Sequence, residues 1–140
     1  MPSKTLLFAA AVLSSLAFAG AAHADPCTAP LPSHAGATFS GVVRYVGDGD
    51  SLCIGASAAP STWIEVRLGD FDAPELHAQD GPAARQLLRR VALGRDAQCM
   101  VTPGRGGRVL SYDRVIAVCR IGGRRIGDLL RAAGGREGGN

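Results

Sequence analysis

The sequence predicts one α+β domain in which five β-strands form a small barrel and two helices pack against it. Three observations support this prediction. Segments rich in β-branched residues, separated by turn signals, recur between residues 39 and 121. One amphipathic stretch, residues 77–94, separates the third such segment from the fourth. The chain has 140 residues, which suits a single domain once the first 24 are set aside.

The first 24 residues have the features of a secretory signal peptide. Lys4 gives a positive start, the apolar run LLFAAAVLSSLAFAGAA follows, and Ala22-His23-Ala24 is a small-x-small cleavage site. We therefore expect export to the periplasm or the medium and cleavage after Ala24. The mature chain would begin at Asp25 and keep no membrane anchor. The alternative is an uncleaved single-span anchor.

The predicted mature chain is mildly basic and contains all four cysteines. Loss of Lys4 leaves 14 of the 15 basic residues, all of them arginine, against 12 acids. This balance permits an anionic partner without demonstrating one. An even cysteine count in an exported chain predicts two disulfides, and the absence of Cys-x-x-Cys spacing argues against structural zinc. Three connectivities remain open at this point.

The N-terminal half predicts an irregular arm and three strands. Residues 25–38 are rich in Pro, Ala and Ser and form the arm. FSGVVRYVGDGDSLCIG, residues 39–55, places strand-forming residues on both sides of a Gly-Asp turn cluster and predicts two strands. TWIEVRLGDF alternates polar and apolar residues, with Trp63, Glu65 and Arg67 on one face, and predicts the third strand.

The C-terminal half predicts a helix, two strands and a second helix. Residues 77–94 have Pro82 in the first turn, an apolar face and Gly94 as a left-handed cap. AQCMV and RVIAVCRI predict strands on either side of a flexible loop, TPGRGGRVLS, and RRIGDLLRAA predicts a short helix. Residues 135–140 should be disordered. This element order is that of a five-stranded Greek-key OB-fold barrel spanning residues 39–134.

Half of the mature acids lie in one short window: Asp48, Asp50, Glu65, Asp70, Asp72 and Glu75. Two clusters stand out among them, Asp48-Gly49-Asp50-Ser51 and Asp72-Ala73-Pro74-Glu75, and each lies at the end of a predicted strand. Antiparallel pairing of the second and third strands would bring these ends together. Carboxylates that meet in this way repel one another unless a cation lies between them, and oxygen ligands select Ca²⁺ or Mg²⁺. Taken singly, each cluster is more typical of a turn or a helix start.

Two arginines add a phosphate-binding function to the acidic clusters. Arg67 lies five residues before Asp72, and Arg114 begins the last strand. A guanidinium matches two phosphate oxygens at once. Phosphodiester cleavage needs a metal, neutralisation of developing charge and a group that orients water. This chain has residues suited to all three tasks, and none of them is histidine. The alternative is that both arginines form surface ion pairs.

Four motifs in order resemble the thermonuclease (staphylococcal nuclease-like) family: VRYVGDGDSLCI, VRLGDFDAPE, GPAARQLL and SYDRVIAVCRIGG. The resemblance covers about residues 39–134. It implies a Ca²⁺-dependent endonuclease that hydrolyses DNA and RNA, single-stranded or denatured substrates preferred, giving 3′-phosphates. It implies no obligatory protein partner, and we expect a monomer.

The resemblance also implies roles by position. Asp50, Asp72 and the backbone carbonyl of Ala73 would bind calcium, with Asp48 and Ser51 nearby. Glu75 would activate or orient water, and Arg67 and Arg114 would bind the scissile phosphate. The same alignment places Cys99 and Cys119 on adjacent strands and implies that they pair, leaving Cys27 to pair with Cys53. His34 and His77 are expected at the surface, and Trp63 in barrel packing.

Three departures from the family pattern keep other functions open. Ser51 replaces a threonine, Asp113 replaces a glycine before Arg114, and the chain stops soon after Leu130, without the family's third helix and base-contacting aromatic residues. One alternative is a non-catalytic OB-fold module that binds nucleic acid. Another is a disulfide-linked secreted protein with an interaction role.

Overall fold

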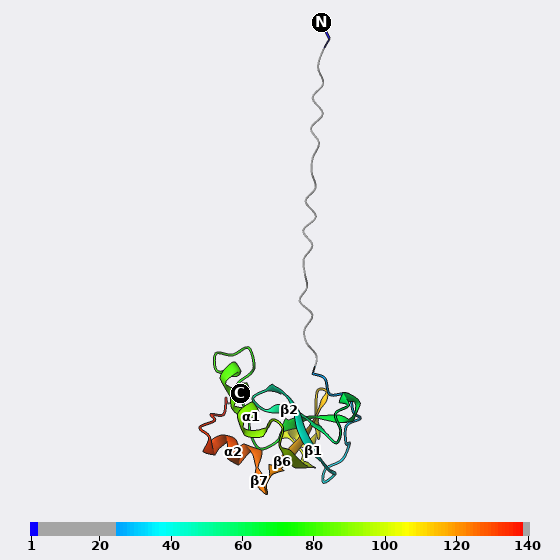
Figure 1. Ribbon diagram of the computed structural model, residues 1–140, viewed down its shortest axis with the longest axis vertical. Helices are drawn as coiled ribbons and strands as arrows, with labels where there is room; N and C mark the ends of the chain where they lie inside the picture. Colours follow the sequence, from blue (N-terminus) through cyan, green and yellow to red (C-terminus); the bar gives the residue numbers. More distant parts are fainter. Residues whose placement is uncertain (3–24, 139–140) are drawn as a thin grey trace.

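The computed structural model describes residues 1–2 and 25–138 (Figure 1). The predicted signal peptide, apart from its first two residues, lies outside this part of the chain, as does its cleavage site. No helix in the described part is long and apolar enough to cross a membrane.

Five strands close into a mixed barrel, as the sequence predicted. They are β1 (Thr38–Asp48), β2 (Ser51–Gly55), β3 (Trp63–Leu68), β4 (Asp96–Val101) and β6 (Arg114–Ile121). β1 pairs antiparallel with β2 and β4, β2 with β3, and β4 with β6. A parallel pairing of β3 with β6, in which Val66 faces Val115, closes the barrel. With the two helices this is an OB-fold-like α+β architecture.

Two short strands lie where the sequence predicted none. β5 (Leu110–Ser111) pairs with the start of β6, within the segment expected to be a flexible loop. β7 (Arg124–Arg125) pairs with the end of β6. The turn before β7 is Gly122-Gly123, and both glycines have positive φ, which allows a tight reversal. The two arginines therefore belong to a hairpin, and the last helix begins at Ile126 rather than at residue 124.

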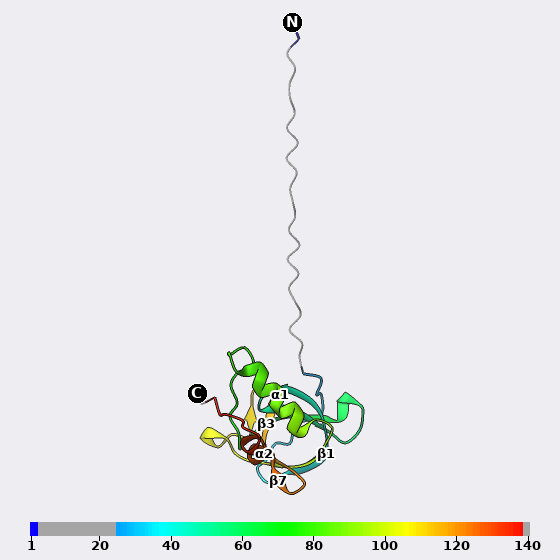
Figure 2. The same cartoon turned by 60° about the vertical axis from the view of Figure 1, so that its left-hand side comes forward.

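The helices α1 (Gly81–Ala92) and α2 (Ile126–Ala132) lie beside each other against the barrel (Figures 1 and 2). α1 has Pro82 in its first turn and ends before Gly94, whose φ is 79°. Both signals had been identified in the sequence. Leu88 of α1 and Leu130 of α2 are buried in one core with Val66 and other inward residues of the strands.

Asp70 joins α2 to the loop that follows β3. Its Oδ2 accepts a hydrogen bond from the backbone N–H of Gly127, 3.2 Å away. A Cβ on Gly127 would lie 2.5 Å from Asp70 Oδ2, so glycine permits this approach. Asp70 Oδ1 is buried and has no hydrogen-bond partner among the described residues. Burial accordingly raises the pKa of Asp70 above its usual range.

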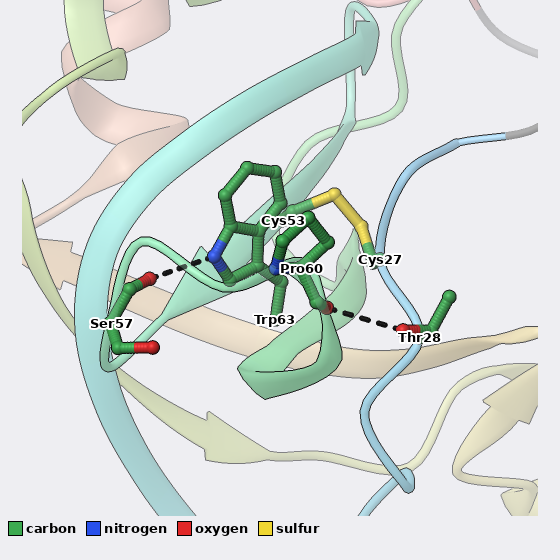
Figure 3. The surroundings of a disulfide bond; sticks show 6 residues. All are labelled: Cys27, Thr28, Cys53, Ser57, Pro60 and Trp63. Carbon is green, nitrogen blue, oxygen red and sulfur yellow. Dashed lines mark hydrogen bonds between the residues drawn. A yellow bond between two sulfur atoms is a disulfide. The ribbon is translucent and has the colours of Figure 1, made fainter.

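Two disulfides hold the barrel, with the connectivity that the resemblance implied. Cys99 and Cys119 face each other across β4 and β6. Cys27 pairs with Cys53 and ties the N-terminal arm to β2 (Figure 3). Disulfides of this kind are compatible with an oxidising compartment.

Trp63 lies beside the Cys27–Cys53 disulfide, half-buried over β2 (Figure 3). Its ring contacts Gly55 so closely that a Cβ there would lie 2.2 Å from the indole. Its Nε1–H donates to the carbonyl of Ser57 at 2.8 Å. The arm is fixed on the same side, because Thr28 Oγ1 donates to the carbonyl of Pro60 at 3.3 Å.

Candidate active site

The β1–β2 turn brings Asp50 into the interior of the molecule. Asp48 and Ser51 oppose each other across the turn, and the N–H of Asp50 donates to Asp48 Oδ1 at 3.0 Å. A Cβ on Gly49 would lie 2.5 Å from Cβ of Ala73 and 2.7 Å from Cβ of Ala84. Glycine at this position therefore allows the turn to pack directly on the segment that follows β3 and on α1.

Asp50 is 6% exposed and is held from two directions. Its Oδ2 accepts a hydrogen bond from the N–H of Ala73 at 2.8 Å and lies 3.3 Å from NH2 of Arg67. Burial raises the pKa of Asp50 from 3.8 to about 7; Arg67 opposes the rise and Asp48 adds to it. A buried carboxylate with this pKa has less positive charge around it than its ionised form needs.

Arg67 joins the two carboxylates that the resemblance assigned to a metal. Its NH2 lies 2.7 Å from Asp72 Oδ1 and 3.3 Å from Asp50 Oδ2. The oxygens of both carboxylates therefore contact one nitrogen atom. NH1 of Arg67 donates to the carbonyl of Phe71 at 2.8 Å and also to that of Leu68. Asp50, Arg67, Asp72 and Ala73 thus form one connected cluster at the ends of β2 and β3.

Arg114 lies at the start of β6, which pairs in parallel with β3, the strand of Arg67. Its NH1 is 4.0 Å from Asp48 Oδ2, and its side chain is mostly covered. Ser51, which is buried, faces Arg67 across β2 and β3. The second predicted arginine is thereby connected to the same hairpin turn as Asp50.

Glu75 is placed differently from the other predicted residues. It is exposed on the loop before α1, two residues after Ala73. Its carbonyl accepts a hydrogen bond from Ala78 N–H at 2.9 Å, and its side chain makes no hydrogen bond or ion pair with the described residues. The structure therefore leaves this carboxylate exposed, without a partner among the described residues and outside the connected cluster.

A pocket of about 570 Å³ lies beside Arg114 and contains three acids that the sequence did not assign to the site. They are Asp25, Glu65 and Asp113, and Asp48 lines the same pocket. Glu65 is 7% exposed. Burial first, then hydrogen bonding to Asp25 and the charge of Asp113, raises the pKa of Glu65 to about 8. The alternation of polar and apolar residues in β3 placed Glu65 on the polar face of the strand. No sequence signal indicated which residues cover it.

The cluster around Asp50 offers only a few possible metal ligands, and all of them are oxygen atoms. Across the described residues, no three His, Cys, Asp or Glu side chains gather into a group able to hold a metal ion. What lies together at the turn is two carboxylates, Asp50 and Asp72, with the backbone of Ala73. This is a hard donor set, suited to Ca²⁺ or Mg²⁺ and to no thiolate-binding metal.

Neither a protein-family model nor a curated protein matches this chain. The assignment of a function therefore depends on the residues of the cluster and on the resemblance of its motifs.

Proposed function

We propose that this protein is an exported, calcium-dependent endonuclease of the thermonuclease type, which hydrolyses phosphodiester bonds in DNA and RNA. The observation that carries the proposal is the contact of Asp50 and Asp72 with one guanidinium nitrogen of Arg67. Residues of opposite charge that serve metal binding and phosphate binding thereby meet at one point of the barrel. Arg114 stands on the adjacent strand.

The donor set fits calcium. Ca²⁺ takes six to eight oxygen ligands, from carboxylates, backbone carbonyls and water. Asp50 and Asp72 would provide carboxylate oxygens, the carbonyl of Ala73 a third ligand, and water and substrate phosphate the rest. The raised pKa of Asp50 supports this assignment, because a buried carboxylate short of positive charge gains most from a cation. When bound, calcium supplies positive charge that polarises the phosphate and lowers the pKa of nearby water.

The protein's own groups would carry the rest of the reaction. Arg67 and Arg114 donate hydrogen bonds to the non-bridging phosphate oxygens and stabilise the charge that develops on them. Glu75, with a free and exposed carboxylate, orients the attacking water and accepts its proton. The bond between phosphorus and the 5′ oxygen breaks as the water oxygen bonds to phosphorus, the leaving 5′ oxygen takes up a proton from solvent water, and the phosphate stays on the 3′ oxygen. Export is part of the proposal, and the two disulfides support it.

Two observations favour a second candidate, a module that binds nucleic acid without cleaving it. Both terminal nitrogens of Arg67 already contact Asp50, Asp72 and two carbonyls. Asp113 adds a negative charge beside Arg114 and lines the same pocket. Both features weaken binding of the transition-state phosphate. The other arginines can still attract a polyanion such as nucleic acid.

The test is release of acid-soluble nucleotides from denatured DNA, with calcium and then with a chelator. Glu75→Ala is the control for contaminating nuclease, because the activity of a contaminant would be the same in preparations of the wild type and of this variant. Calcium-dependent release that Glu75→Ala abolishes supports the nuclease. Folded, calcium-replete protein that binds DNA without releasing nucleotides would support the binding module instead.

A further inference from the structure

Residues 135–138 were expected to be disordered, but in the structure this segment after α2 folds back over the loop that carries Asp72 and is hydrogen-bonded to it. The N–H of Gly138 donates to the carbonyl of Asp72 at 2.7 Å, and the N–H of Asp72 donates to Glu137 Oε1 at 3.2 Å. Two consecutive residues therefore bind both backbone polar groups of Asp72. A Cβ on Gly138 would lie 2.7 Å from Cα of Pro74, so glycine allows the segment to lie directly on the loop.

Arg131 of α2 holds Glu137 in this position. Its NH2 lies 3.0 Å from Glu137 Oε1 and also donates to the carbonyl of Asp70. Its guanidinium carbon lies 5.5 Å from the centre of the Phe71 ring. Arg131 and Glu137 together thus contact three successive residues, Asp70, Phe71 and Asp72.

The loop is therefore fixed from two sides. From the barrel, Asp50 Oδ2 accepts the N–H of Ala73 at 2.8 Å. From the C-terminal segment, Glu137 accepts the N–H of Asp72, one residue earlier. These two N–H groups belong to the residues whose carboxylate and carbonyl are the proposed calcium ligands. The direction of both ligands depends on the backbone that Glu137 holds.

We infer that Glu137 is a positioning residue for the cation site, which it orients through the backbone of Asp72 and through Arg131. The inference rests on the proposed function, because it assigns Glu137 a role in calcium binding. Exposed ion pairs contribute little to global stability. The side chains of Arg131 and Glu137 are 43% and 45% exposed, so loss of Glu137 should affect calcium affinity more than unfolding.

The experiment measures calcium binding by titration calorimetry without nucleic acid, on the full chain expressed with export so that its disulfides form. Glu137→Ala removes the acceptor for the N–H of Asp72 and is expected to weaken calcium binding about three- to tenfold, the range for one lost hydrogen bond. Glu137→Gln keeps an acceptor oxygen and should restore most of the affinity. The matched control is Asp128→Ala, since Asp128 lies 3.3 Å from the same arginine, NH1 of Arg131.

Asp128 pairs with Arg125 and Arg131 and with no described residue of the loop that carries Asp72. Removal of Asp128 should therefore leave calcium affinity within about twofold of the wild type. Equal affinities for wild type and Glu137→Ala, with both proteins folded by circular dichroism, would overturn the inference and leave the proposed function intact. A wild-type chain that binds no calcium would overturn both. If Glu137→Ala does not fold, Glu137→Asp, which shortens the side chain, carries the same expectation.

Discussion

The backbone N–H of Ala73 donates a hydrogen bond of 2.8 Å to Oδ2 of Asp50, a residue that precedes it by 23 positions. This bond joins the β1–β2 turn to the loop after β3. It also occupies one oxygen of the Asp50 carboxylate, Oδ2, and leaves Oδ1 for further ligands. The carboxylate of Asp50 is thereby fixed to the backbone of the residue that directly follows Asp72.

Calcium should stabilise the folded protein through this pair. A ligand at about 100 times its dissociation constant raises the free energy of unfolding by about 2.7 kcal/mol. For a domain of this size that corresponds to roughly 10 °C in thermal midpoint. Asp50→Asn should lose most of this increase, because it removes a charged ligand.

Differential scanning calorimetry with calcium and with a chelator measures the effect. Asp96→Asn, an exposed acid at the start of β4, is the matched control and should keep the full shift. If Asp50→Asn responded to calcium as strongly as the wild type did, the cation would have to bind elsewhere.

Arg114→Ala should lower kcat/KM by about a hundred- to a thousandfold, the cost of removing one donor to a charged transition state. The matched variant is Arg120→Ala in the same strand, β6. Arg120 is exposed, and its NH1 donates to the carbonyl of Gly123 at 3.1 Å. Steady-state hydrolysis of a short oligonucleotide distinguishes the two. Comparable losses in both variants would show a general effect of positive charge rather than a specific role of Arg114.

Much of the barrel could be predicted from local signals, since each depends on near neighbours in sequence. Alternation in β3 identified Val66 and Leu68 as inward, and Pro82 and Gly94 marked the limits of α1 closely. The hairpin turn placed Asp48 and Asp50 at a strand end. All of these depend on the preferences of a few consecutive residues.

The rest depends on contacts between distant segments. Glu65 is buried although it belongs to the polar face of β3, because the pocket that it lines is also lined by the arm residues Asp25 and Cys27. Glu137 contacts Asp72 across 65 positions. No periodicity or turn signal encodes either approach. The short strand β7 was missed because its arginines match a helix as well as a strand when the hairpin partner is unknown.

Loss of the Cys99–Cys119 disulfide should cost about 3 kcal/mol of unfolding free energy, the value for a loop of this length. The two cysteines are 20 positions apart, and both are buried. The double variant Cys99→Ala, Cys119→Ala tests this by urea unfolding, with the wild type under the same oxidising conditions. Peptide mapping without reduction is the control for connectivity. A peptide joining Cys27 to Cys99 would contradict the pairing and the estimate together.

Glu65 should make the folded protein less stable as pH rises through the neutral range. Its pKa is raised from 4.5 to about 8, first by burial and then by Asp25 and Asp113. Between these values the folded state binds more protons than the unfolded state. The free energy of unfolding therefore falls as pH increases from about 4.5 to about 8, and this contribution levels off above pH 8.

Glu65→Gln removes this proton and should flatten the decline. Urea unfolding at a series of pH values, in a chelator so that Asp50 behaves alike in both proteins, gives the two slopes. Asp50 and Asp70 also have raised pKa values and contribute a decline of the same sign to both proteins. The difference between the slopes is therefore the contribution of Glu65. Parallel curves for wild type and Glu65→Gln would mean that Glu65 ionises normally and that the arm does not hold Asp25 against it.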